Sequence, residues 1–184
     1  NGKERPFEHI PTIPPRVYSK VLRAIAGETV TYASVVHIPR DAFPEWLEET
    51  WKEYRERNLA LVGGSSSSEI YPGFSVGEAA AIASSSGPGY FLGGVTIPER
   101  HAARRREHER IMAKSSLGLR FFASQVIYNP RHVIDMLKDY GSLCRQRGSD
   151  PARIILNFTL FGTQKMADFL EWLGVDVPPE TAGR

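Results

Sequence analysis

The sequence contains one cysteine, no long hydrophobic run and little net charge, and each shortage excludes a class of protein. Cys144 has no partner for an internal disulfide or a multi-cysteine metal site, which fits a reducing compartment. No run approaches the ~18 consecutive apolar residues of a membrane span, and residues 1–15 lack the apolar middle of a signal peptide. We therefore expect a cytoplasmic protein with no membrane partner.

The formal net charge of +2 at pH 7 is close to balance. A nucleic-acid partner would require a concentrated basic face, which the chain as a whole lacks. The local exception is a cluster formed by Arg104, Arg105, Arg106 and Arg110. Helical spacing would spread these residues over a solvated face. We favour that interpretation and rank a nucleic-acid site last.

Familiar motifs of catalysis are also missing. No set of His, Cys, Asp and Glu residues has the spacing of metal ligands, so the sequence predicts no metal site. No Gly-x-Ser-x-Gly segment indicates a serine nucleophile. No Gly-x-Gly-x-x-Gly segment follows an apolar run, which argues against a Rossmann site for a nicotinamide.

What the sequence does contain is an alternation of apolar runs with stretches of helical periodicity. Continuous apolar character is typical of strands that are buried on both faces, and the alternation predicts βα units around a parallel sheet. The five runs are 31–38, 58–63, 90–96, 120–128 and 153–159. Helices are predicted over 16–26, from Phe43, from Ser75, over 102–117, from Asn129 to about Gly148, and over 165–173 with Gly174 ending the last one.

The predicted fold class is α/β, a parallel (β/α)8 TIM-type barrel that is incomplete, with about five to six βα units. We expect one domain over residues 1–184, in which 1–30 form an extension and a first helix and 31–178 form the repeats. A complete barrel takes about 250 residues. Either part of the barrel sequence is missing, or the chain is a fragment, or the sheet is open, and we favour the first.

Ligands of parallel βα folds bind at the carboxyl ends of the strands. His37 and His101 follow two of the apolar runs, and each can bind a ligand or be hydrogen-bonded structure. Gly63 and Gly64 precede four serines that begin at Ser65. Such a loop can bring backbone N–H groups and hydroxyls to a phosphate or carboxylate, or it can be a flexible polar loop.

Gln125 lies inside an apolar run, where an unpaired amide would cost about 1 to 3 kcal/mol. Backbone, water or a bicyclic heteroaromatic ligand with adjacent donors and acceptors could each satisfy the amide. Lys114 near the end of the helix predicted over 102–117 can stabilise the helix dipole or reach a phosphate, and the first interpretation is the simpler.

Three segments together resemble the methylenetetrahydrofolate reductase family. They are GGVTIPERH at 93–101, Lys114 with LGLRFFASQVIYN at 117–129, and TLFGTQKMADFLEWLGVDVP at 159–178, and the resemblance spans roughly 30–180. It implies a flavin-bearing β/α-barrel enzyme of one-carbon metabolism. In that family hydride passes from a nicotinamide to FAD and then to methylenetetrahydrofolate, so FAD, NAD(P)H and a folate substrate are implied, and a homo-oligomer stays open.

The resemblance also implies roles for individual residues. Contacts to the flavin are implied for His37, Gly64, Ser65, His101, Glu107 and Lys114. Gln125 matches the strand glutamine that contacts folate and nicotinamide. For the general acid that protonates the folate ring, Glu8 is the one candidate.

The chain departs from the family at three of its functional positions. Gly63-Gly64-Ser65 replaces an Arg-Gly-Asp-like strand end, which removes a negative charge near the flavin. Ile97 replaces a tyrosine, and Gln164 stands where an aromatic residue stacks on the substrate. The first hypothesis is therefore a flavin-dependent reductase of a folate-bound one-carbon unit. The alternative is a folate-binding or regulatory relative without reductase activity.

Overall fold

The computed structural model describes residues 12–64, 69–160 and 162–178, so the predictions for Glu8 and Ser65 fall outside the described residues. The chain divides into two compact units. We call the described part of Pro11–Val95 with Lys114–Phe121 the amino-terminal unit. We call Thr96–Ala113 with the described part of Phe122–Arg184 the carboxy-terminal unit.

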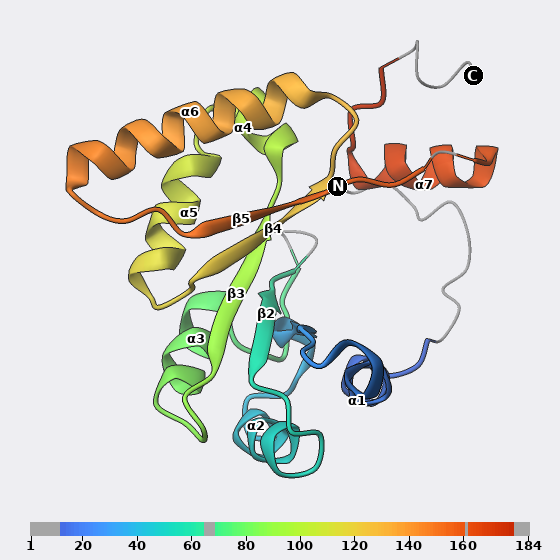
Figure 1. Cartoon of the computed structure of the whole chain (residues 1–184), viewed down its shortest axis with the longest axis vertical. Coiled ribbons are helices and arrows are strands. Elements are labelled where there is room, and N and C mark those ends of the chain that lie inside the picture. Colours follow the sequence, from blue (N-terminus) through green and yellow to red (C-terminus); the bar gives the residue numbers. More distant parts are fainter. Residues whose placement is uncertain (1–11, 65–68, 161, 179–184) are drawn as a thin grey trace. The chain divides into compact units, whose positions relative to one another are not determined.

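The amino-terminal unit contains the first three strands and the helices before and between them (Figure 1). Its elements are α1 (Pro15–Ala26), β1 (Thr31–Ser34), the 3-10 turn η1 (Val35–His37), α2 (Phe43–Lys52), β2 (Asn58–Val62), α3 (Val76–Ser84) and β3 (Phe91–Thr96), whose last residue belongs to the other unit. The strands pair in parallel, with Thr31 opposite Leu59 and Leu59 opposite Leu92.

The core of the amino-terminal unit forms where β2 meets its neighbours. Leu59, Ala60 and Leu61 are completely buried, as expected for a strand covered on both faces. On β3, a Cβ at Gly93 would lie 2.3 Å from the Phe121 ring. Glycine is therefore required there because the aromatic ring occupies the space of a side chain.

The carboxy-terminal unit contains the remaining helices and strands. Its elements are α4 (Pro98–Arg104), most of α5 (Glu107–Ser116), β4 (Phe121–Val126), α6 (Pro130–Arg147), β5 (Arg153–Asn157) and α7 (Gln164–Leu173). Helices α4 and α6 pack against each other. The backbone N–H of Ile127 donates to the Asn157 carbonyl, which ties the end of β4 to the end of β5.

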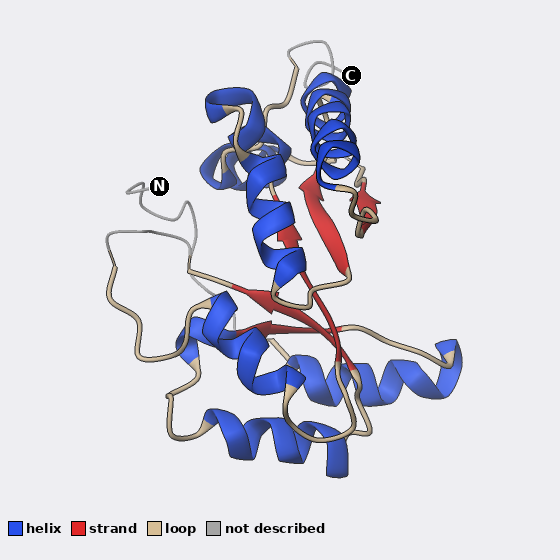
Figure 2. Cartoon of the chain, turned by 90° about the vertical axis from the view of Figure 1, so that its left-hand side faces the viewer, coloured by secondary structure: helices blue, strands red, loops and turns tan. Residues whose placement is uncertain are grey.

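The five strands form one parallel sheet in the order β1-β2-β3-β4-β5, and helices alternate with strands along the chain (Figure 2). The predicted parallel α/β architecture is confirmed, whereas a closed eight-stranded barrel is not shown. Among the described residues, the longest helices are too short or too polar to cross a bilayer.

Several local predictions are confirmed. Ser75 and Glu78 form a capping box at the start of α3, and the Asn129 side chain caps α6 by accepting from the Arg131 N–H. Gly148 and Gly174 end α6 and α7 in the left-handed conformation.

Two predicted elements are wrong in their extent. The run 31–38 is a strand only to Ser34, after which the chain enters η1. The helix expected over 102–117 is two helices, because Arg105 adopts a left-handed conformation (φ 51°) that ends α4. A non-glycine residue rarely takes this conformation, so the sequence gives no signal for the break.

Candidate functional site

The carboxyl ends of β1 and β2 bring two predicted site residues to one aromatic side chain. The exposed His37 ring packs edge-on against Tyr71, with 5.3 Å between ring centroids. A Cβ at Gly64 would lie 2.3 Å from the same Tyr71 ring. His37, Gly64 and Tyr71 therefore form one surface of the amino-terminal unit, and the glycine is needed for that close approach.

Lys114 is directed toward the end of β3. Its Nζ donates to the Val95 carbonyl oxygen at 3.2 Å, and the side chain is half-buried. The predicted choice for this lysine lay between the helix dipole and a phosphate. The hydrogen bond to a strand carbonyl decides neither, so both interpretations stay predictions.

Glu107 is almost fully buried at the start of α5 and holds the end of β3. Its Oε1 accepts from the Thr96 hydroxyl at 3.2 Å and from the Ile97 N–H at 3.1 Å. Its Oε2 is buried without a hydrogen bond, with the Arg110 guanidinium 3.9 Å away. One half of this carboxylate is therefore satisfied by the fold and the other half is not.

His101 is completely buried between α4 and α6. Its Nε2 lies 3.1 Å from Oδ2 of Asp139, and the same oxygen accepts from the Arg105 guanidinium at 2.6 Å. Burial lowers the pKa of His101 below its usual value of 6.5, and the nearby Asp139 carboxylate only partly opposes that effect. The Nδ1 atom of His101 is buried without a partner.

Gln125 lies near the end of β4 and is half-buried. Within the described part of the chain, its amide has no hydrogen-bond partner. The preceding residue, Ser124, is fully engaged, because its hydroxyl accepts from the Asn157 N–H at 2.9 Å and its carbonyl accepts from the Asn157 amide at 2.6 Å. The strand end is thus fixed in place while the neighbouring amide is left available.

A second polar group at the starts of α4 and α6 was missed by sequence reasoning. Burial raises the pKa of Glu99, and its Oε2 and the Nδ1 of His132 are both buried without hydrogen bonds. Asp176 lies 3.5 Å from His132 Nε2 and accepts from the Asn129 amide at 2.7 Å. The Asn129-Pro130 signal located the start of α6, but nothing in the sequence indicated that Asp176 contacts Asn129 there.

Gln164 stands apart from these groups. It is exposed at the start of α7, and its amide donates to Asp168 at 2.8 Å within the same helix. This contact is typical of a solvent-exposed helix surface. No contact in the described part of the chain joins Gln164 to another candidate residue.

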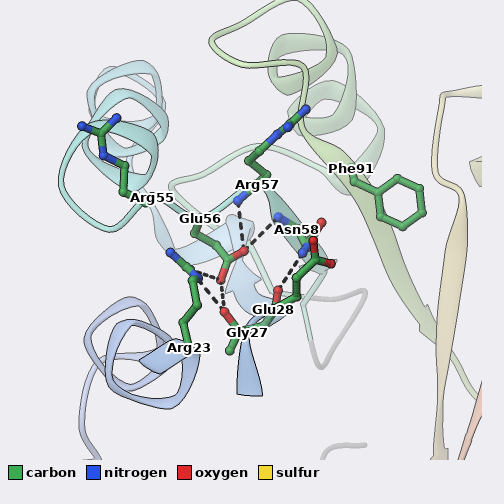
Figure 3. A pocket seen from close by; sticks show the side chains of 9 residues that line it. Arg23, Gly27, Glu28, Arg55, Glu56, Arg57, Asn58 and Phe91 are labelled. Atoms are coloured by element: carbon green, nitrogen blue, oxygen red, sulfur yellow. Dashed lines mark hydrogen bonds and ion pairs between the residues drawn. The ribbon is translucent and has the colours of Figure 1, made fainter. Parts of the chain in front are cut away.

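A cavity of about 270 Å³ opens at the opposite ends of the strands, beside the first residues of β2 and β3 (Figure 3). Its centre is the buried Glu56 carboxylate, which pairs with Arg23 at 2.8 Å. Both carboxylate oxygens are occupied, because Thr29 donates to Oε2 and the backbone N–H groups of Arg57 and Asn58 donate to Oε1. This network is complete without a ligand, so we assign it to folding.

No family model and no curated protein matches the sequence, so the resemblance to methylenetetrahydrofolate reductases stays a prediction. Solved structures do match. An uncharacterized protein from Clostridium thermocellum that binds two copies of 5-methyl-5,6,7,8-tetrahydrofolic acid is 30% identical, with a TM-score of 0.77 over 93% of this chain. A candidate lyase/mutase from Burkholderia cenocepacia J2315 is 16% identical, with a TM-score of 0.51 over 89% of this chain, and shares the fold alone.

The chain spans 58% of the length of each of these two proteins. The likeness to the Clostridium protein therefore covers nearly all of this sequence but only part of its neighbour. The chain accordingly has the strand and helix arrangement of part of a methyltetrahydrofolate-binding protein, and it aligns with that protein at the level of sequence as well as fold.

Proposed function

We propose that this chain carries part of a binding site for a reduced folate, with the pterin ring held at the carboxyl end of β4. The observation that carries the proposal is the half-buried Gln125 amide, which has no hydrogen-bond partner among the described residues. An amide in a largely apolar strand needs a partner, and a pterin offers adjacent donors and acceptors that match both halves of it.

The similar Clostridium protein supports the choice of ligand, because it binds 5-methyltetrahydrofolate and shares 30% of aligned residues. The position also agrees with the general rule that parallel βα folds bind ligands at the carboxyl ends of their strands. We place Gln125 as the pterin contact of the carboxy-terminal unit.

Binding without reduction is favoured over flavin-dependent reduction. Three side chains expected at a flavin have partners within the fold: His101 contacts Asp139, Glu107 contacts the end of β3, and Lys114 contacts Val95. These contacts give each side chain a structural role that needs no cofactor. Reduction through FAD with NAD(P)H is therefore the second candidate, and the family resemblance alone favours it.

Calorimetric titration of the purified chain with 5-methyltetrahydrofolate tests the proposal. We expect saturable binding that Gln125→Ala weakens about tenfold or more, since an unmade hydrogen bond costs about 1–3 kcal/mol. Gln146→Ala, the same change on the exposed face of α6, is the matched control and should bind like the unaltered protein.

Two results would change this assignment. Equal affinity of the Gln125→Ala and Gln146→Ala proteins would remove Gln125 from the site, and no binding by the unaltered chain would reject the folate proposal. A flavin absorbance band in the purified protein, with NAD(P)H oxidation that depends on methylenetetrahydrofolate, would favour the reductase over a binding protein.

A further inference from the structure

Three potential metal ligands converge in the carboxy-terminal unit, away from Gln125 in sequence and on different elements. One nitrogen each of His101 and His108 and one carboxylate oxygen of Asp139 lie within 4.8 Å of one another. The two imidazole rings meet edge-on with 5.2 Å between their centroids. We propose that these three residues bind a divalent transition-metal ion of the zinc class.

The geometry depends on the left-handed Arg105 backbone. His101 lies on α4 and His108 in the first turn of α5. In a single continuous helix these seven residues would span almost two turns, so the two side chains would share a face but lie about 10 Å apart along the axis. The break at Arg105 turns the chain back and sets the two rings against each other. Asp139 reaches them from α6, which packs on α4.

Unsatisfied polar atoms provide a second, independent observation. His101 is completely buried, and its Nδ1 and that of His108 have no hydrogen-bond partner in the described structure. Buried polar atoms without partners are rare, and an unfilled ion site is one established reason for them. Asp139 is 32% exposed, so a cation could enter from the side of α6.

The ligand types select the class of ion. Imidazole nitrogens suit zinc and its first-row neighbours, whereas magnesium and calcium prefer an all-oxygen environment. Two histidines and one carboxylate leave a coordination position open for water or another ligand. We therefore use Zn²⁺ as the probe and Mg²⁺ as the ion that should not bind.

Arg105 offers a test of whether a metal ion would contact Asp139. Its guanidinium, 59% exposed, donates to the same Asp139 oxygen that faces His101. A positively charged group thus already occupies the side of the carboxylate that a metal would take. Zn²⁺ must displace it, so removal of the guanidinium should tighten metal binding.

Calorimetric titration of the chelator-treated full chain with Zn²⁺, at neutral pH, tests the proposal, and Co²⁺ in place of Zn²⁺ reports the ligand field by its visible absorption. We expect His108→Ala and Asp139→Asn each to weaken Zn²⁺ binding at least about tenfold, since even outer-sphere partners of metal ligands contribute 10–100-fold. His132→Ala, which removes another histidine of the same unit, should bind like the unaltered protein, and Arg105→Gln should bind more tightly.

His108→Ala and Asp139→Asn change partly exposed residues and keep the buried His101. Circular dichroism of each protein separates lost binding from lost folding. The proposal is overturned if Zn²⁺ binds no better than Mg²⁺, or if folded His108→Ala and Asp139→Asn proteins bind Zn²⁺ as well as His132→Ala does. Unchanged or weaker binding by Arg105→Gln would also overturn it, because the ion would then not meet the Asp139 oxygen. None of these outcomes depends on folate.

Discussion

The two units differ in how completely their buried carboxylates are hydrogen-bonded. In the amino-terminal unit, Glu56 is 1% exposed and both of its oxygens accept hydrogen bonds, from Arg23, two threonines and two backbone N–H groups. In the carboxy-terminal unit, Glu107 is equally buried but one of its oxygens has no hydrogen bond. The same unit holds every unpartnered buried side-chain atom found among the described residues: those of Glu99, His101, Glu107, His108 and His132.

This difference separates groups that hold the fold together from groups available to a ligand. A buried polar group with all its partners present adds rigidity, whereas one without partners costs free energy that something else must offset. The cavity beside Glu56 is therefore structural despite its size, while the polar groups around α4, α5 and α6 are where ligands are expected. Gln125 belongs to the same unit but is only half-buried, and its amide has no hydrogen-bond partner among the described residues.

The largest expected effect breaks the satisfied network. Glu56→Gln replaces a carboxylate oxygen with an N–H₂ that meets Arg23 and two threonine hydroxyls, leaving the half-buried Arg23 guanidinium without its counter-charge. We expect a loss of about 3 kcal/mol in the free energy of unfolding, measured by urea denaturation. The matched control, Glu48→Gln, alters an exposed helix pair and should cost less than about 0.5 kcal/mol. Equal losses in the two variants would contradict a structural role for Glu56.

A second change in the amino-terminal unit adds a dependence on pH. The buried Tyr90 hydroxyl donates to the Leu47 carbonyl, and burial raises the pKa of Tyr90 to about 12, with Arg16 opposing weakly. The unfolded chain releases this proton near pH 10 and the folded chain near 12, so stability should fall as pH rises through that interval. Tyr90→Phe should cost about 1 kcal/mol at pH 7 and abolish this part of the alkaline decline. A decline of the same size in Tyr90→Phe would assign it to other groups.

The smallest expected effect comes from Glu107→Gln, which makes the same substitution at the carboxylate that has one oxygen without a hydrogen bond. In Glu107→Gln the amide oxygen can keep both contacts to the end of β3, and the N–H₂ replaces an oxygen that had no hydrogen bond. The free energy of unfolding should therefore change by less than about 1 kcal/mol. A loss as large as that of Glu56→Gln would show that the Arg110 guanidinium, 3.9 Å from Oε2, stabilises this carboxylate as strongly as hydrogen bonds stabilise Glu56, and would erase the contrast between the units.

Local signals in the sequence predicted most of the fold. The Ser75 to Glu78 spacing and the Asn129-Pro130 pair each encode a helix start within four residues, and both are observed. Apolar runs located all five strands, although only the inner strands have the burial on both faces that such runs predict. In β1 buried and exposed residues alternate, and β5 has no buried residue. The break at Arg105 could not be predicted, because tertiary contacts there override the ordinary preference of arginine for a right-handed conformation.

The candidate site was less predictable because its contacts join distant residues. The sequence marked Gln125 by its unusual place in an apolar run, and the structure leaves its amide available. It did not reveal that His101 meets Asp139, 38 positions further on, or that Asp176 returns to the start of α6. The proposed metal ligands have no recognisable sequence spacing for the same reason, since they lie on three helices.

Hydrogen–deuterium exchange with and without saturating 5-methyltetrahydrofolate tests the division between the two kinds of buried group most directly. Protection on binding is expected over residues 122–132, where Gln125 lies, while residues 55–58 around Glu56 keep the exchange rates of the free protein. Protection at 55–58 without any at 122–132 would place the ligand in the cavity that we consider structural, and would contradict the account.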